Sequence, residues 1–264
     1  MKIGFIGGGA LTEAVVKGIA EKFTAAEDIY ISDHKQARCN ELIQKYKVNA
    51  AVGIDSFIEI VDTLFIAVKP KDADKAMKEV SSKVKTAAVI VSVVAGLSIE
   101  KIEQYFKTQT VIRVMPNVAI SVSEGMSAFA VGTKSKISDV ELISKLWQSL
   151  GRCIKVDERL MDAVTGLSGS GSAYAFLMID ALSDGGVAAG LPRTKAIELA
   201  AQTLFGAAKM VLESGAHPDV LRDKVTSPAG TTIEGIRVLE RCGVRSALIE
   251  AVIAATEKSK TFKI

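Results

Sequence analysis

A glycine-rich turn near the start of the chain constrains the fold more than any other feature. Gly7, Gly8 and Gly9 separate an apolar run at residues 3–6 from an amphipathic helical pattern at residues 10–22. In a strand–turn–helix unit, the first glycine allows a tight turn and a later one lets the backbone approach a pyrophosphate. A plain loop is the alternative, but the strand and helix around these glycines favour a dinucleotide site.

The helix after the turn supplies part of this predicted site. Ala10 and Leu11 open it, and we expect their amides to face the pyrophosphate, because the first amides of a helix have no partner within the helix. Thr12 stands where the dinucleotide fingerprint has Gly or Ala, which allow helix and strand to pack closely. The sequence departs from the fingerprint at this position.

Apolar, β-rich runs alternate with helical stretches in the first half of the chain. The predicted strands are residues 3–6, 29–32, 63–68, 88–94 and 111–115, with edge strands at 126–131 and 153–156. The predicted helices between them include residues 10–22, 35–46 and 137–150. Continuously apolar strands separated by helices indicate a parallel sheet that is covered on both faces.

The pattern changes after Asp157, where Ala, Leu, Met, Ile and Glu recur at helical spacing and β-rich runs disappear. We therefore predict an α/β fold, with a Rossmann-type doubly wound parallel sheet in residues 1–157 and an all-helical domain in residues 158–264. Residues 174–187 and 247–255 are apolar on more than one face, which predicts burial against another chain.

Composition excludes several classes of function. The net charge is only +3, and Lys and Arg are interspersed with Asp and Glu, so nucleic-acid binding is not expected.

Cys39, Cys153 and Cys242 lie far apart, which argues against disulfides and zinc and fits a reducing, cytoplasmic compartment. With two histidines we expect no metal site. Asp180 and Asp184 interrupt the most apolar stretch, so no membrane span is expected.

The end of the second predicted strand bears on the choice of cofactor. Asp33 lies where an acidic residue would accept both ribose hydroxyls of NAD, and its charge would repel the extra phosphate of NADP. Ser32, His34, Lys35 and Arg38 together could instead hold that phosphate. A third interpretation makes Asp33 the N-cap of a solvent-exposed helix. The sequence leans towards NADH and leaves NADPH open.

Two more segments with small residues follow predicted strands. They are Ala67-Val68-Lys69-Pro70, after the run at 63–68, and Ala95-Gly96, after the run at 88–94. In a doubly wound sheet, ligands lie at the carboxyl ends of the strands, where small residues leave room for a cofactor. For Lys69 and Pro70 a simple turn before a helix is the alternative.

Later motifs complete a pattern that runs from Lys2 to about Thr256. They are Met115-Pro116-Asn117, Ser168-Gly169-Ser170-Gly171-Ser172-Ala173-Tyr174 and Val225-Thr226-Ser227-Pro228-Ala229-Gly230-Thr231-Thr232. With the glycine turn and Val68-Lys69-Pro70, their order and spacing resemble the pyrroline-5-carboxylate reductase family. The departures are small: Ala10-Leu11 where the family commonly has Asn-Met, Ser172 in place of Pro, and Ala229-Gly230 where Gly-Gly is frequent.

The resemblance implies an NADH- or NADPH-dependent reduction of 1-pyrroline-5-carboxylate to L-proline. It implies that the amides of Gly230 and Thr231 bind the substrate carboxylate and that the Thr232 hydroxyl bonds the ring nitrogen as the catalytic group. Ser170 would belong to a small-residue wall beside the substrate, and Asn117 to the cofactor site. It also implies a homodimer, or an assembly of dimers, formed by the helical domain.

Alternatives remain open at this stage. Thr231 and Thr232 would serve only as helix caps in an anonymous sequence. A related reductase would act on a cyclic imine of another ring size. A regulatory relative would bind the dinucleotide without catalysis.

Overall fold

The computed structural model describes residues 1–20 and 22–262. These residues form an eight-stranded sheet in the order β3-β2-β1-β4-β5-β6-β7-β8. The strands are β1 (Ile3–Ile6), β2 (Ile29–Ser32), β3 (Asn49–Ala51), β4 (Thr63–Ile66), β5 (Val89–Ser92), β6 (Thr110–Met115), β7 (Gly125–Val131) and β8 (Gly151–Lys155). The helices around the sheet are α1 (Ala10–Ile19), α2 (Gln36–Tyr46), α3 (Ala73–Val80), α4 (Ile99–Tyr105) and α5 (Ile137–Gln148).

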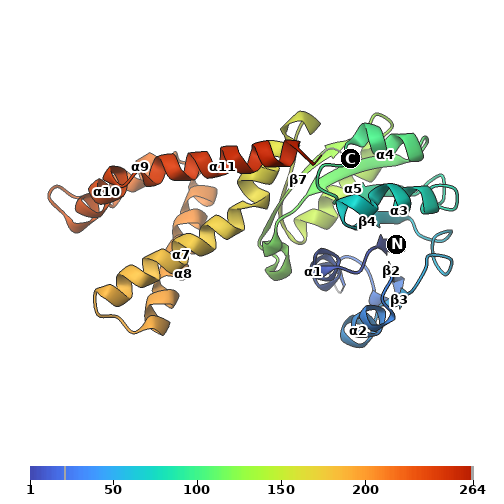
Figure 1. Ribbon diagram of the computed structural model, residues 1–264, viewed down its shortest axis with the longest axis horizontal. Coiled ribbons are helices and arrows are strands. Elements are labelled where there is room, and N and C mark those ends of the chain that lie inside the picture. The colour runs from blue at the N-terminus through green and yellow to red at the C-terminus, as the bar shows by residue number, and fades with distance from the viewer. Residues whose placement is uncertain (21, 263–264) are drawn as a thin grey trace. The chain divides into compact units, whose positions relative to one another are not determined.

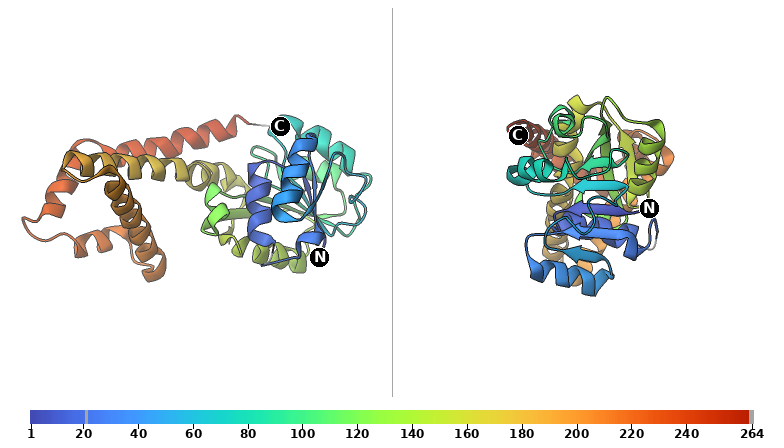
Figure 2. Two further views of the ribbon diagram at one scale, coloured as in Figure 1. Left: turned by 90° about the horizontal axis from the view of Figure 1, so that it is seen from below. Right: turned by 90° about the vertical axis from the view of Figure 1, so that its right-hand side faces the viewer.

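Both faces of the sheet are buried, which explains why its central strands are apolar at every position. Leu64 and Ile66 of β4 belong to the core that contains α3 and α4, whereas Phe65 between them belongs to the core that contains α1, α2 and α5. Trp147 of α5 lies fully buried in this second core, as its place on an apolar helix face predicts. Helices accordingly flank the strands on both sides in Figures 1 and 2.

The sheet is parallel except at one position. The chain adds β2 and β3 on one side of β1 and β4, β5 and β6 on the other, so the strand order reverses between β1 and β4. Strand β7 then pairs antiparallel with β6, and β8 pairs parallel with β7. The predicted doubly wound sheet is confirmed, with this one antiparallel pair as an addition.

Contacts divide the chain into two compact units, residues 1–170 with 253–262 and residues 171–252. The second unit is helical and consists of α7 (Gly171–Ala188), α8 (Arg193–Ser214), α9 (Pro218–Lys224), α10 (Thr231–Arg241) and the start of α11 (Val244–Lys260). A short helix, α6 (Met161–Val164), and a π-helical turn at Thr165–Gly169 precede α7. An all-helical C-terminal region was predicted and is confirmed.

Some local predictions differ from the structure. The helix predicted at residues 10–22 ends at Ile19, and its residue 21 lies outside the described part of the chain. Strand β3 was not predicted, because Asn49-Ala50-Ala51 lacks β-branched or aromatic residues. His217 is the N-cap of α9 and accepts a hydrogen bond from the Asp219 amide.

Accessibility separates the three cysteines. Cys39 is buried, Cys153 is half-buried and Cys242 is exposed, and all three are free thiols. Burial raises the pKa of the Cys153 thiol to about 12. Among the helices described, none combines the length and the apolar composition that a bilayer crossing requires.

Candidate functional site

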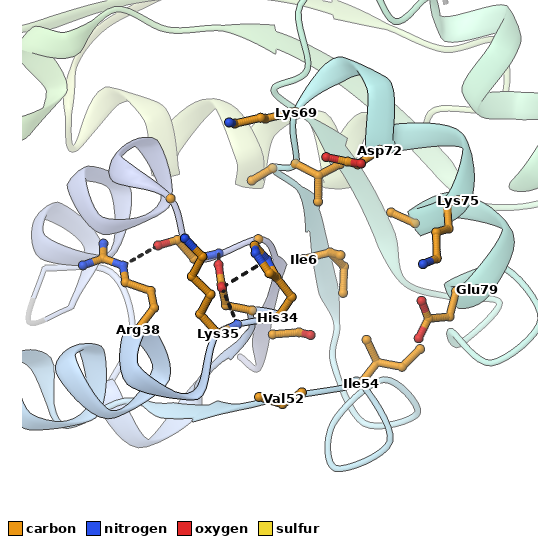
Figure 3. Close-up of a pocket in the computed structure, with 18 of the residues that line it drawn as sticks. Ile6, His34, Lys35, Arg38, Val52, Ile54, Lys69, Asp72, Lys75 and Glu79 are labelled. Atoms are coloured by element: carbon orange, nitrogen blue, oxygen red, sulfur yellow. Dashed lines mark hydrogen bonds and ion pairs between the residues drawn. The ribbon is translucent and has the colours of Figure 1, made fainter.

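A crevice of about 870 Å³ opens at the carboxyl ends of β1, β2 and β4, where the strand order reverses. This volume lies within the usual range for small-molecule sites. The lining residues predicted from the sequence are Gly7, Gly9, Ser32, Asp33, His34, Ala67, Val68 and Lys69, and Lys35 and Arg38 lie beside them. Figure 3 shows Arg38, Lys35 and His34 on the β2–α2 side and Lys69, Lys75 and Glu79 across the opening.

The glycine turn has little room for side chains. Gly7 has φ of +104°, and a Cβ there would lie 2.5 Å from the carbonyl oxygen of Ala67. Gly9 has an ordinary φ of −69°, and a Cβ there would meet no protein atom within 4 Å, so the space beside Gly9 is free for a ligand. The turn therefore needs glycine at position 7 for its conformation, and glycine at position 9 keeps the approach to the backbone open.

Thr12 fits the turn although it departs from the fingerprint. Its hydroxyl donates a 2.6 Å hydrogen bond to the carbonyl oxygen of Gly7, and its side chain is buried. The Gly7 amide in turn donates to the Ser32 carbonyl of β2 at 2.8 Å. The departure at this position thus adds a hydrogen bond that closes the turn between β1 and α1.

Helix α1 presents free donors to the crevice. Its N-cap is Gly9, which has no capping side chain. Within the residues that the structure describes, the amides of Gly9, Ala10, Leu11 and Thr12 donate to no acceptor, and the first amide that does is that of Glu13, to the Gly9 carbonyl. Such a cluster of unpaired amides at the positive end of a helix binds phosphate groups. Ala10 and Leu11 contribute through their backbone and do not line the crevice with side chains.

Asp33 is held by backbone donors. One carboxylate oxygen accepts from the Gly8 amide at 2.9 Å, and the other accepts from the Lys35 amide at 2.9 Å. The N-cap of α2 is Lys35, so the interpretation of Asp33 as the N-cap is wrong. Asp33 lines the crevice next to the exposed His34.

Besides Ala10 and Leu11, four predicted cofactor residues lie outside the crevice lining: Pro70, Ala95, Gly96 and Asn117. Pro70 begins a short 3-10 helix at Pro70–Asp72 with Lys69 as its N-cap, which matches the turn considered as the alternative. Gly96 has φ of +75°, and a Cβ there would overlap the backbone carbonyl of Phe262. The Asn117 side-chain oxygen accepts from the Met126 amide at 3.1 Å, which ties β6 to β7.

The loop before α10 forms a second candidate site within the helical unit. Ala229 has a positive φ of 54°, in the left-handed region that non-glycine residues avoid. Gly230 is the N-cap of α10 and has no side-chain cap, so Thr231 and Thr232 are the first helical residues and their hydroxyls do not cap the helix. The capping interpretation of these two threonines is therefore wrong.

Free polar groups cluster at this helix start. Thr231 and Thr232 are exposed, and across the described residues neither their amides nor their hydroxyls have a hydrogen-bond partner. Backbone amides at a helix N-terminus can bind a carboxylate, and a hydroxyl can both donate and accept hydrogen bonds. Ser170, the other predicted substrate residue, follows the π-helical turn and donates its amide to the Thr165 carbonyl at 2.9 Å.

Comparisons with known proteins give matches to both parts of the chain. Residues 158–262 match the family model described as pyrroline-5-carboxylate reductase dimerisation, and residues 2–96 match that described as NADP oxidoreductase coenzyme F420-dependent. The pyrroline-5-carboxylate reductase of Arabidopsis thaliana is 40% identical over 98% of this chain and 94% of its own length. That of Synechocystis is 41% identical over 98% of this chain and 97% of its own length. The chain belongs to the pyrroline-5-carboxylate reductase family.

Solved structures of pyrroline-5-carboxylate reductases share the whole fold. A Plasmodium falciparum pyrroline carboxylate reductase with NADP bound has a TM-score of 0.90 at 28% identity and covers 100% of this chain and 98% of that one. A pyrroline-5-carboxylate reductase from Coxiella burnetii has a TM-score of 0.91 at 28% identity, with the same coverage. The resemblance inferred from the motifs is confirmed over the full length.

The sequence did not reveal every residue of this reductase's crevice. The lining residues that were missed are Ile6, Gly8, Val52, Gly53, Ile54, Lys71, Asp72, Lys75, Ala76 and Glu79. Most of them follow the unpredicted strand β3 or lie on α3, which faces the opening across from α2 (Figure 3). If residues 49–51 had been recognised as a strand, Val52 would have been placed at the carboxyl end of that strand, where ligands bind in such a sheet.

Proposed function

We propose that this chain reduces 1-pyrroline-5-carboxylate to L-proline with NADH or NADPH. The observation that carries the proposal is that α1 and α10, one in each unit, both begin without a capping side chain. The chain is also 40% identical to the pyrroline-5-carboxylate reductase of Arabidopsis thaliana over 98% of its length. A dinucleotide in the crevice would supply the hydride from its reduced nicotinamide. The conversion requires no metal and no covalent nucleophile, because a protonated imine is already electrophilic.

Residues of the first unit would hold the dinucleotide. The amides of Gly9, Ala10 and Leu11 are free to bind its pyrophosphate, and no side chain fills the space beside Gly9. Asp33 would face the adenosine ribose. These residues fit a dinucleotide, and we keep Ser32, His34, Ala67, Val68, Lys69, Pro70, Ala95, Gly96 and Asn117 as its proposed further contacts.

Residues of the helical unit would hold the imine. The free amide of Thr231 would bind the ring carboxylate, and the Gly230 amide would join it by giving up its 3.1 Å hydrogen bond to the Ser227 carbonyl. The Thr232 hydroxyl would donate or accept a hydrogen bond at the ring nitrogen, which ends the reaction as an amine. Ser170, the last residue of the first unit before α7, is kept as a further proposed substrate contact. The work of the site is to orient the ring and exclude water, which lowers the barrier by fixing the reacting groups in place.

The assay of choice is steady-state oxidation of NADH and of NADPH in the presence of pyrroline-5-carboxylate. Thr232→Ala should lower kcat by at least tenfold, since removing a well-placed transition-state hydrogen bond costs about 1.5–3 kcal/mol. Dinucleotide affinity should stay the same. Thr203→Ala is the matched control, because the Thr203 hydroxyl donates to the Leu199 carbonyl of its own helix. An unchanged kcat in Thr232→Ala would remove that residue from the site.

Two alternatives give different results in the same assay. A reductase for another cyclic imine would turn over a six-membered or sulfur-containing ring faster than pyrroline-5-carboxylate. A regulatory relative would bind the dinucleotide and oxidise none of it.

We also keep residues 1–157 and 158–264 as the proposed domains of the reductase.

The helical unit would pair with a second copy of the chain. It exposes large apolar side chains that a folded monomer would bury, among them Phe176, Leu177, Leu199, Phe205, Met210 and Leu239. The dimerisation model matches this same part of the chain. Size-exclusion chromatography should give a dimer or a multiple of it, and a stable, fully active monomer would contradict the proposal.

A further inference from the structure

Both backbone polar groups of Gly8 are held by hydrogen bonds. The Gly8 amide donates to the Asp33 carboxylate at 2.9 Å. The Gly8 carbonyl accepts a 2.7 Å hydrogen bond from Nε of Arg38, in the first turn of α2 (Figure 3). Gly8 is therefore the residue at which β2 and α2 fix the conformation of the glycine turn.

The bond from Arg38 also sets the direction of the next amide. The described residues contain no cis peptide bond, so the Gly8 carbonyl and the Gly9 amide point in opposite directions across one planar peptide. With the carbonyl turned towards the guanidinium of α2, the Gly9 N–H must point away from it. That N–H is the first of the free donors at the start of α1.

Arg38 itself is fixed by carboxylates. Its Nη2 lies 2.5 Å from Glu13 of α1, and its Nη1 lies 2.7 Å from Glu41 of α2. Glu13 also accepts from Lys45 at 2.6 Å and from the Tyr46 hydroxyl at 2.9 Å. All three nitrogens of the guanidinium thus have an acceptor on the protein, and its side chain is only 19% exposed.

We propose that Arg38 is a positioning residue for the dinucleotide: it orients the Gly8–Gly9 peptide so that the Gly9 amide is presented to the pyrophosphate. The proposal rests on the dinucleotide site of the proposed function. It replaces the idea that Arg38 is a ligand of the NADP phosphate, because the nitrogens of the guanidinium already bond to Gly8, Glu13 and Glu41.

Arg38→Met tests the proposal by direct binding. The dissociation constants of NADH and NADPH are measured by quenching or enhancement of the nicotinamide fluorescence, without the imine. We expect both constants to rise by the same factor, about tenfold, since both dinucleotides share the pyrophosphate. A rise for NADPH alone would overturn the proposal in favour of a phosphate ligand, and no rise for either would leave Arg38 a purely structural role and also overturn it.

Matched variants separate positioning from loss of stability. Arg159→Met removes an exposed guanidinium whose one ion-pair partner among the described residues is Asp157, and it should leave both constants unchanged. Arg38→Lys keeps one charge but cannot reach Gly8, Glu13 and Glu41 together, so its constants should fall between those of the parent and Arg38→Met. Thermal unfolding confirms that each variant is folded at the assay temperature.

The enzymatic readout is independent of the binding readout. With pyrroline-5-carboxylate saturating, Arg38→Met should raise the KM for the dinucleotide about as much as the dissociation constant and leave kcat within a factor of two. If the parent protein binds NADH but reduces no imine, the proposed function fails while the binding measurement still decides the role of Arg38.

Discussion

Glu13 connects α1 to α2, and replacing it should make the stability of the protein less dependent on pH. Hydrogen bonds from Lys45 and Arg38 lower the pKa of the Glu13 carboxyl from 4.5 to about 2. A lowered pKa means that folding favours the charged form. The stabilisation is therefore complete above pH 4.5 and is lost as the pH falls towards 2.

The size of the effect follows from the pKa. A change from 4.5 to about 2 corresponds to roughly 3 kcal/mol at pH 7. Because 21% of the Glu13 side chain is exposed, water screens part of the attraction, and about 2 kcal/mol is the expected net contribution. Glu13→Gln, which keeps the size of the side chain and removes its charge, should destabilise the protein by this amount at pH 7.

Urea unfolding of the parent and of Glu13→Gln at pH 7 and pH 3, at one fixed protomer concentration, measures the difference. We expect the difference in unfolding free energy to shrink by more than half at pH 3, because Glu13 is then largely protonated in the unfolded chain and folding to the charged form must release that proton. A difference that stays constant between the two pH values would refute the electrostatic explanation. A difference near zero at pH 7 would mean that solvent screens the network completely.

The remaining predictions concern the crevice. Gly7→Ala should destabilise the protein by about 1–3 kcal/mol, measured by urea unfolding, because its φ is +104° and its Cβ would press on the Ala67 carbonyl. Gly9→Ala should unfold like the parent, since its Cβ meets no protein atom, yet bind NADH at least tenfold more weakly in a fluorescence titration. Asp33→Asn keeps an acceptor for the Gly8 amide and removes the charge, so the ratio of NADPH to NADH affinity should rise; an unchanged ratio would mean that Asp33 does not face the ribose.

Much of the fold could be predicted because a strand that is buried on both faces of the sheet has apolar residues at consecutive positions. The central strands are continuously apolar, and the change of pattern after Asp157 marks the start of the helical region. What could not be predicted depends on weak local signals or on distant partners. Asn49-Ala50-Ala51 has little β propensity of its own and is a strand because it pairs with β2. Nothing in residues 125–131 specifies that β7 runs antiparallel to β6.

In the candidate site too, features with a local sequence pattern could be predicted and contacts between distant residues could not. The glycine turn was recognisable because its chemistry is local, whereas the roles of Thr231 and Thr232 were inferred only from the family resemblance. The contacts of Arg38 were not, because Gly8 and Glu13 lie 30 and 25 residues away in sequence. The role of Thr12 was also hidden, since a fingerprint that asks only for a small residue does not anticipate a hydroxyl bonded to Gly7.

The unequal environments of the three thiols make this chain suitable for labelling without mutation. Cys39 is shielded, and the high pKa of Cys153 leaves almost no reactive thiolate at neutral pH, whereas Cys242 is exposed at the end of α10. A maleimide dye should therefore attach to native protein at a single position in the helical unit. Mass spectrometry would show one adduct on the folded chain and three after denaturation, so the same reagent would also report the folded fraction of every variant proposed above.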